Sequence, residues 1–315
     1  MAVLVTGSNG FVGTALCARL PRTGAEVRAA ARHPVAAPPG VRGFQIGAIS
    51  SQTDWRLALR DVEQVVHLAA RVHVMRDTSF SPLAEFRRVN VEGTVNLARQ
   101  AAVAGVRRFV FLSSIKVNGE CTEVGQPFGA DDPAAPQDPY AVSKYEAEEL
   151  LRQVGIETGM EVVIIRPPLV YGPGVKANFQ QMMRWLARGL PLPLAGIEGN
   201  RRSLVALDNL VDLVVTCLRH PAAANQRFLV SDGEDLSTAM LLRRMGQAQG
   251  GGAKLFRVPS VALKTAAAFF GKRDVYRRIC GSLQVDISKT SELLGWTPPV
   301  SVDEGLRRAF AGFQA

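Results

Sequence analysis

Three glycines at three-residue intervals directly follow the first apolar run of this chain. The run Ala2–Val5 predicts a buried strand, and apolar residues recur at helical spacing over Ala15–Leu20. In a strand, turn and helix of this kind, Gly7 permits the tight turn, Gly10 lets another molecule approach the backbone and Gly13 allows close packing of the helix. The loop therefore predicts an open α/β fold that begins with a βαβ unit.

The same loop predicts a phosphate site. Backbone N–H groups and the helix dipole at a helix N-terminus favour a bound anion. A Gly-x-x-Gly-x-x-Gly spacing between a strand and a helix is the context of a dinucleotide-binding site. The residues expected to contact the dinucleotide are Gly7, Asn9, Gly10, Phe11, Val12 and Gly13, together with Ala69, Ala70 and Pro167 after later strands.

Strand and helix patterns alternate through the first half of the chain. Strands are expected near residues 2–6, 26–31, 41–46, 64–69, 108–113 and 161–166, and helices near 11–20, 53–60, 80–104 and 140–157. Repeated βα units predict a Rossmann-type, doubly wound parallel sheet. We expect residues 1–166 to form this NAD(P)-binding domain, with segments near 205–230 returning to it. Residues 167–315 are expected to form mainly a smaller C-terminal α/β substrate-binding domain.

Tyr140 and Lys144 are four residues apart in a predicted helix, so their side chains lie on the same face. A free phenol has a pKa of about 10, too high for proton exchange near neutral pH. A lysine ammonium beneath the ring, helped by an oxidised nicotinamide ring, favours the phenolate, and Tyr140 is expected to act as a general acid and base. Ser113 and Ser114 end an apolar strand, where ligands of an open parallel sheet bind, so a serine hydroxyl is expected beside Tyr140.

These motifs together resemble the extended short-chain dehydrogenase/reductase family, in its nucleotide-sugar branch. The resemblance covers essentially the whole chain and rests on Thr6–Gly13, Asn90, Ser113-Ser114, Tyr140 with Lys144, and Arg166–Gly172. It implies that Ser114, Tyr140 and Lys144 are catalytic and that Asn90 supports the proton relay. It also implies that Lys144 holds the nicotinamide ribose, and that two copies associate through the long helices as a homodimer.

The end of the second predicted strand bears on the choice of cofactor. An NAD enzyme usually has an acidic residue here for the ribose 2′-hydroxyl, whereas an NADP enzyme has an arginine near the 2′-phosphate. This chain has Ala31 at the acidic position and Arg32 after it, with Arg28 as a second candidate. NADP(H) is therefore favoured, with NAD(H) as the alternative.

The residues after Ser114 narrow the reaction. Members of the family that remove water from the sugar carry an Asp-Glu pair here, whereas this chain has Ile115-Lys116, which leaves dehydration without its acid/base couple. Two remaining reactions need only the serine, tyrosine and lysine. One is NADPH-dependent reduction of the C4 ketone of a UDP-4-keto-6-deoxy-N-acetylhexosamine, and the other is 4-epimerisation of a UDP-hexose with tightly bound NAD.

Two features favour the reductase among these. Arg32 has no acidic partner, and Ser113–Glu120 resembles bacterial reductases that form UDP-N-acetylquinovosamine in surface-polysaccharide synthesis. The 4-epimerase is the close alternative. A non-catalytic NADP(H)-binding sensor or scaffold is the alternative outside enzymes.

The resemblance also places substrate contacts. Arg202 matches the family arginine that contacts the nucleotide phosphates, and Asn178 matches the segment that meets the sugar nucleotide. Arg278, or its neighbour Arg277, is expected to provide a second phosphate contact. Lys116 and the hydroxyl of Ser114 are expected to face the sugar.

Composition limits the partners. The chain of 315 residues has 37 Lys and Arg against 28 Asp and Glu, a net charge of +9 that suits a dinucleotide and a UDP-sugar. The same charge could equally favour nucleic acid or an acidic membrane surface, but the basic residues are scattered and form no nucleic-acid module, so neither partner is expected. No apolar run approaches the length of a membrane span, and a cytoplasmic protein is expected. The four cysteines show no metal-ligand spacing, so no metal is expected.

Overall fold

A parallel sheet organises the larger part of the protein. The computed structural model describes residues 1–33, 39–72, 81–269, 271, 273–311 and 313. Within these residues, seven strands form one sheet in the order β3-β2-β1-β4-β5-β6-β9, and every neighbouring pair is parallel. The strands are β1 (Ala2–Thr6), β2 (Glu26–Ala31), β3 (Val41–Gln45), β4 (Gln64–His67), β5 (Arg108–Leu112), β6 (Glu161–Arg166) and β9 (Arg227–Leu229).

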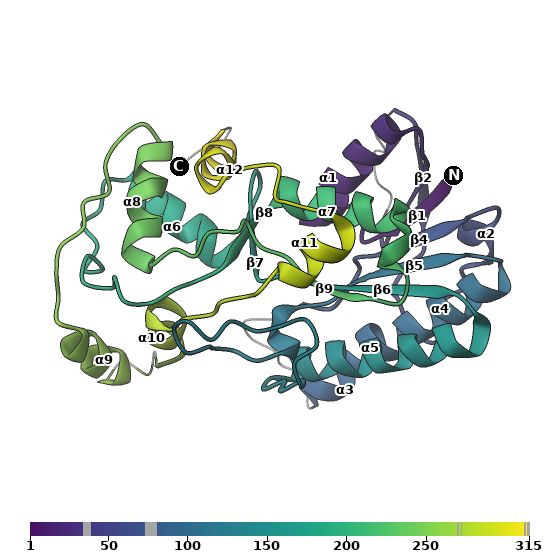
Figure 1. Ribbon diagram of the computed structural model, residues 1–315, viewed down its shortest axis with the longest axis horizontal. Coiled ribbons are helices and arrows are strands. Elements are labelled where there is room, and N and C mark those ends of the chain that lie inside the picture. Colours follow the sequence, from purple (N-terminus) through teal and green to yellow (C-terminus); the bar gives the residue numbers. More distant parts are fainter. Residues whose placement is uncertain (34–38, 73–80, 270, 272, 312, 314–315) are drawn as a thin grey trace.

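Helices cover both faces of this sheet. The helices are α1 (Phe11–Arg19), α2 (Arg56–Leu59), α3 (Pro82–Arg87), α4 (Gly93–Val103), α5 (Pro139–Thr158), α6 (Ala177–Ala187), α7 (Leu207–Arg219), α8 (Thr238–Ala248), α9 (Ser260–Phe269), α10 (Arg273–Cys280), α11 (Ser288–Leu294) and α12 (Val302–Phe310). Figure 1 shows α1 and α7 above the sheet and α4 and α5 below it.

Burial on both faces explains the apolar strands. Leu16 and Leu210 pack with the core on the side of α1 and α7, and Leu97 and Leu151 pack on the side of α4 and α5. All five residues of β1 are buried, as expected for a strand covered on both faces. The predicted doubly wound α/β fold is confirmed.

Some predicted boundaries were wrong. The helix expected near 53–60 is only α2, because the N–H of Trp55 donates to Gln100 Oε1 at 2.8 Å, which ties the chain before α2 to α4. The strand expected near 64–69 ends at His67. In the helix expected near 80–104, residue 80 lies outside the described residues, and a π-helical turn over Arg88–Glu92 separates α3 from α4.

The C-terminal part adds a smaller unit. Strands β7 (Leu169–Tyr171) and β8 (Leu204–Ala206) form a two-stranded parallel sheet, and α6, α8 and α12 pack beside it. The Tyr171 hydroxyl donates to Asp232 Oδ2 at 2.7 Å inside this unit. Strand β9 pairs with β6 and α7 packs on α1, and the expected return of residues near 205–230 to the first domain stays a prediction. The division at residues 166 and 167 stays a prediction.

A buried ion pair holds α5 against β6. Arg166 and Glu148 are both fully buried, and Arg166 Nε donates to the two carboxylate oxygens at 2.9 and 3.2 Å. Arg166 Nη1 donates to Asn118 Oδ1 at 2.8 Å, and the Ser113 hydroxyl donates to Glu148. Since each charge depends on its partners for solvation, losing one leaves the other unpaired in the core.

Substituting Glu148→Gln is therefore expected to lower the free energy of unfolding by about 3–5 kcal/mol. Glu146→Gln is the matched control, because Glu146 pairs with Arg87 on the exposed side of the same helix and its loss should cost less than about 1 kcal/mol. Urea unfolding of both variants measures the difference. Equal effects would contradict the role assigned to the buried pair.

Candidate active site

The glycine loop has the shape needed to hold a dinucleotide. Gly7 has φ of +64°, and a Cβ there would lie 2.8 Å from the backbone nitrogen of Ala69. A Cβ on Gly13 would lie 2.1 Å from the carbonyl oxygen of Gly7. Helix α1 can therefore pack this closely against the loop only because residue 13 is glycine. Asn9 and Gly10 are exposed just before α1. This arrangement is compatible with a pyrophosphate at the N-terminus of α1, and the predicted dinucleotide contacts stay a prediction.

A polar relay fixes the end of β4 beside this loop. Thr6 Oγ1 accepts the N–H groups of Leu68 and Ala69, each at 3.2 Å, so its own proton is directed to Nδ1 of His67 at 2.7 Å. His67 Nε2 lies 2.9 Å from the hydroxyl of Thr94, to which it donates in that tautomer. Burial, and then the Lys144 charge, lower the pKa of His67 to about 3, so the ring is neutral. The relay brings Ala69 next to Gly7.

The sequence did not single out His67. A lone histidine at the end of an apolar strand carries no signal of its own, because its partners Thr6 and Thr94 are far away along the chain. Their meeting depends on the parallel pairing of β1 with β4 and on the packing of α4.

Ser114, Tyr140 and Lys144 meet at the carboxyl end of β5. Ser114 begins a short 3₁₀ turn, and its Oγ accepts the N–H of Lys116 at 3.3 Å. Tyr140 is in the first turn of α5, which Asp138 caps by accepting the N–H of Ala141 at 2.7 Å. The Tyr140 ring is half-buried beside Ser114, to which it is hydrogen-bonded.

Lys144 is buried beneath the site. Its side chain is 2% exposed, and Nζ donates to the carbonyl of Leu112 at 2.7 Å and lies 4.1 Å from the centre of the Phe111 ring. Burial lowers the pKa of Lys144 from 10.5 to about 7, although the carboxylate of Glu148 acts in the opposite direction. Near neutral pH, Lys144 is therefore close to its pKa, and both its charged and its neutral forms are populated.

The expected lowering of the Tyr140 pKa does not occur in the protein alone. Burial raises the pKa of Tyr140 to about 12, the charge of Asp138 raises it further, and the hydrogen bond with Ser114 acts in the opposite direction. The expectation combined the charge of Lys144 with that of an oxidised nicotinamide ring, so it stays a prediction for the protein with its cofactor; Lys144 itself donates to the carbonyl of Leu112. Phenolate formation then needs additional positive charge near the ring.

Asn90 lies in the π-helical turn between α3 and α4. Its amide nitrogen donates to the carbonyl of Arg71 and to Ser143 Oγ, both at 3.0 Å, and its Oδ1 accepts the N–H of Arg71 at 2.8 Å. The Ser143 hydroxyl in turn donates to the carbonyl of Tyr140 at 2.7 Å. Asn90 thus ties the chain after β4 to the start of α5, and its predicted part in a proton relay stays a prediction.

Three predicted ligand-binding cations, Lys116, Arg28 and Arg32, lie in different surroundings in the structure. Lys116 forms an ion pair with Asp138 and lies 3.5 Å from Glu120, so it neutralises the cap of α5. Arg28 is buried, and its Nη1 donates to the carbonyls of Ala58 and Arg60 beside α2. It is therefore directed away from the cofactor position, while Arg32 is exposed after β2.

Three of the predicted substrate residues, Asn178, Arg202 and Arg278, lie in the C-terminal unit. The backbone of Arg202 forms isolated β-bridges with Leu236 and Leu283. Its side-chain Nη1 donates to the carbonyl of Gly281 at 3.1 Å, and burial lowers the pKa of the guanidinium. Arg278 is exposed on α10, which ends next to Gly281. The structure thus brings Arg202 and the end of α10 together.

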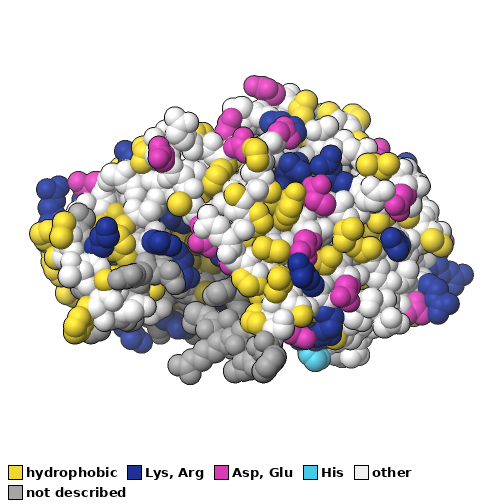
Figure 2. Space-filling model, turned by 90° about the horizontal axis from the view of Figure 1, so that it is seen from below, with side chains coloured by type: hydrophobic (Ala, Val, Ile, Leu, Met, Phe, Trp, Pro, Cys, Tyr) yellow, Lys and Arg dark blue, Asp and Glu magenta, His cyan; other side chains and the backbone are white. Residues whose placement is uncertain are grey.

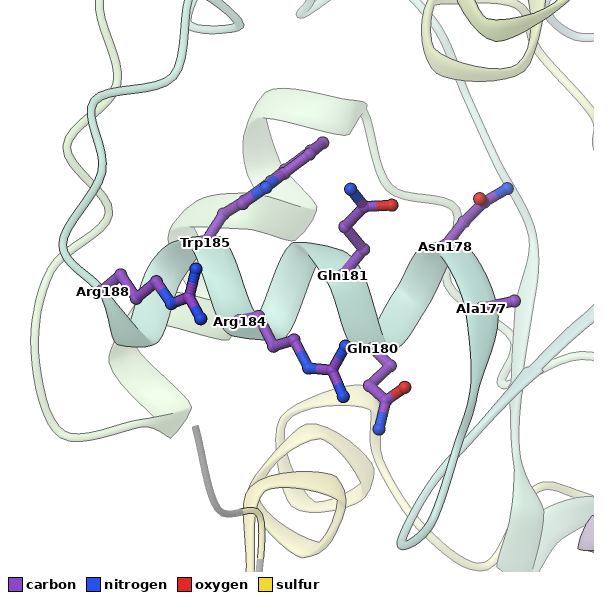
Figure 3. Close-up of a pocket in the computed structure, with 7 residues that line it drawn as sticks. All are labelled: Ala177, Asn178, Gln180, Gln181, Arg184, Trp185 and Arg188. Carbon is purple, nitrogen blue, oxygen red and sulfur yellow. The ribbon is translucent and has the colours of Figure 1, made fainter.

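Asn178 lines a surface pocket of about 410 Å³ along α6. Figure 3 shows Gln180 and Arg184 on one side of this helix and Gln181 and Trp185 on the other, with Asn178 near its start. Pro167 is buried after β6, and its carbonyl accepts the N–H of Ile115 at 3.0 Å. That bond holds the strand end that carries Ser114.

The described part of the chain has neither a cluster of metal ligands nor a membrane-spanning helix. No group of three or more His, Cys, Asp or Glu side chains there is placed to hold a metal ion. None of the helices there has the length and apolar character needed to cross a bilayer.

Comparisons with known proteins assign the family. The model of the NAD dependent epimerase/dehydratase family matches residues 3–231, and the chain belongs to this family. A UDP-glucose 4-epimerase of Vibrio cholerae is 50% identical over 313 residues, which cover 99% of this chain and 95% of that protein.

Solved structures agree in fold. UDP-glucuronic acid 4-epimerase from Bacillus cereus in complex with NAD superposes with a TM-score of 0.79 at 22% identity, covering 99% of this chain and 98% of the other. MoeE5 in complex with UDP-glucose and NAD superposes with a TM-score of 0.78 at 25% identity, with the same coverage. The resemblance to the extended short-chain dehydrogenase/reductases is confirmed.

Burial of Lys144 has a measurable cost. An unfolded lysine titrates at 10.5 and the folded one at about 7, so between these values only the unfolded chain takes up the proton and stability falls as the pH falls. In protein stripped of nucleotide, Lys144→Met is expected to be more stable than the wild type by on the order of 2 kcal/mol at pH 7. The gain should shrink as the pH rises toward 10.5.

Thermal unfolding at several pH values measures this effect. Lys176→Met is the control, because Lys176 is exposed and its replacement should leave the pH dependence unchanged. A Lys144→Met protein that is less stable at pH 7, or whose gain does not vary with pH, would contradict the assigned burial cost.

Proposed function

We propose that the protein is a UDP-hexose 4-epimerase that interconverts the C4 epimers of UDP-glucose and UDP-galactose with tightly held NAD. The main support is the 50% identity with the Vibrio cholerae UDP-glucose 4-epimerase over 99% of the chain. The sequence alone favoured an NADPH-dependent C4 reductase, with the 4-epimerase as the close alternative. The proposal adopts the 4-epimerase. Ser114, Tyr140 and Lys144 suffice for either reaction, so the site chemistry is compatible with the change.

The relatives support NAD over NADP. The case for NADP rested on Arg32 after Ala31, with Arg28 as its helper, and Arg28 donates instead to two carbonyls beside α2. Arg32 therefore remains as the one feature of the described residues that favours NADP. MoeE5, which is 25% identical, contains NAD in its complex with UDP-glucose.

The proposed chemistry begins with a proton transfer at the sugar. Tyr140, as phenolate, takes the proton of the C4 hydroxyl, and Ser114 donates a hydrogen bond to the same oxygen as charge develops there. Oxidised NAD, when bound, would supply the acceptor for the C4 hydride and positive charge near the phenol, and epimerisation requires that the hydride return to the opposite face of the sugar. Tyr140 returns its proton to the oxygen at the end of the cycle, so the reaction is redox-neutral.

Lys144 supports the phenolate. With a pKa of about 7, it retains a large protonated fraction at neutral pH and places that charge one helical turn from Tyr140. The buried carboxylate of Glu148 favours the protonated form. In the family, the corresponding lysine also holds the nicotinamide ribose, and the buried position of Lys144 is compatible with that contact.

Arg202 is the proposed contact for the substrate diphosphate. Its guanidinium is partly buried beside Gly281, which limits competing water and leaves further N–H groups for phosphate oxygens. Arg278, on the helix that ends at this point, is proposed as the second cation. Asn178 at the start of α6 is proposed to meet the sugar nucleotide from the other side.

The experiment is to purify the protein, denature one portion and identify the released nucleotide, and to incubate another portion with UDP-glucose and no added cofactor. The proposal expects stoichiometric NAD and formation of UDP-galactose. Tyr140→Phe is the matched control, and it should retain the nucleotide while its turnover falls by about 10²-fold or more, because the general acid/base is lost.

Other outcomes separate the alternatives. An empty site that binds NADPH in preference to NADH and gives no epimer would overturn the proposal in favour of a C4 reductase. Bound nucleotide with no turnover of any nucleotide sugar would favour a sensor or scaffold.

A further inference from the structure

Most of the net charge comes from one short segment. Residues 254–280 contain seven Lys and Arg and one acidic residue, Asp274, which gives this segment a charge of +6 in a chain whose total is +9. The basic residues are Lys254, Arg257, Lys264, Lys272, Arg273, Arg277 and Arg278. The five whose exposure the structure describes are all exposed. The expectation of scattered basic residues was therefore wrong for this segment.

The same segment exposes large apolar side chains. Val261 is 74% exposed and Phe269 is 84% exposed, and Phe256 and Val275 are nearly half exposed. Val261 and Phe269 are eight residues apart on α9, so they lie on the same outward face, with exposed Lys264 at its border. Helices of soluble proteins normally turn such residues toward the core.

The position of α9 explains why these side chains stay exposed. Helices α9 and α10 pack against each other at the lower left of Figure 1, away from the large sheet. None of the described side chains of α9 belongs to the hydrophobic clusters of the protein. Figure 2, seen from this lower side, shows hydrophobic and basic side chains next to one another on the smaller unit at the left.

We propose that the segment 254–280 docks on an anionic phospholipid surface. The apolar face of α9 enters the boundary between headgroups and acyl chains, and the exposed Lys254, Lys264 and Arg277 pair with acidic headgroups. Val261 and Phe269 can both enter the acyl boundary, whereas valine has no stacking partner on a nucleic-acid base. Arg257 is paired with Glu198, and the remaining positive charge of the segment fits the spread negative charge of a membrane. Helix α9 has ten residues, so it lies in the surface and does not span it.

Docking would bring Arg202, the proposed contact of the substrate diphosphate, close to the membrane. Helix α10 ends at Cys280, and the next residue, Gly281, holds Arg202. Because Arg278 is assigned to substrate binding, the test uses Lys264 and Phe269, which have no role in the proposed reaction. The inference therefore does not depend on the substrate.

The test is sedimentation of the full-length protein with vesicles of phosphatidylcholine alone and of phosphatidylcholine with phosphatidylglycerol. Binding is expected to be at least about tenfold tighter to the anionic vesicles and to weaken with added salt. Lys264→Gln should weaken binding about fivefold, and Phe269→Ser about tenfold.

Two exposed residues elsewhere serve as controls. Arg22→Gln removes a charge near α1, and Leu57→Ser removes an apolar side chain that is 70% exposed on α2. Neither should change vesicle binding. Absence of binding to anionic vesicles, or equal losses in the control variants, would overturn the proposal. A change in oligomeric state caused by Phe269→Ser, without vesicle binding, would overturn it in favour of a contact between two copies.

Discussion

The candidate site depends on how α5 crosses the carboxyl end of β5. Tyr140, Lys144 and Glu148 follow one another at four-residue intervals and lie along one side of α5. The carbonyl of Leu112 accepts from Lys144, and the carboxylate of Glu148 binds Ser113 and Arg166. Two buried ionisable groups of the helix thus have partners on the strands, which fixes the helix along and around its axis. Tyr140, one turn earlier, is thereby held beside Ser114.

This arrangement gives the site its electrostatic character. Burial disfavours both the charged form of Lys144 and the phenolate of Tyr140, so their pKa values move toward about 7 and about 12. A protein selected for stability alone would place an apolar residue beneath the tyrosine. A buried ammonium is instead a group whose charge acts strongly on its surroundings, since little water screens it. The site therefore responds strongly to any further positive charge that a ligand brings.

Much of the fold was predictable because its signals are local. The glycine loop, the apolar strands and the Tyr140/Lys144 spacing are each signals within a short stretch of sequence. In the structure, the glycine loop follows the carboxyl end of β1, and Tyr140 lies beside Ser114, which follows the carboxyl end of β5. The π-helical turn at Asn90 was not predictable, because it depends on contacts with Arg71 and Ser143. The orientation of Arg28 likewise depends on carbonyls 30 and 32 residues away, in α2 and just after it. Partners distant along the chain decide such details.

The pKa of Tyr140 illustrates the same limit. Helical spacing correctly placed Lys144 one turn from Tyr140, but spacing alone contains no information on burial or on the carbonyl of Leu112. The choice between NAD and NADP also rested on one exposed arginine. By contrast, the concentration of charge in residues 254–280 was visible in the sequence, and only the exposed face of α9 gave it a physical meaning.

The most direct test follows the hydrogen at C4 of the sugar. UDP-glucose with deuterium at C4 is incubated with the protein and no added cofactor, and the products are analysed by mass spectrometry and NMR. Because an epimerase returns the hydride to the carbon from which it came, the account predicts UDP-galactose that retains deuterium at C4. Deuterium found in free reduced nicotinamide, with a ketosugar and no epimer, would contradict it.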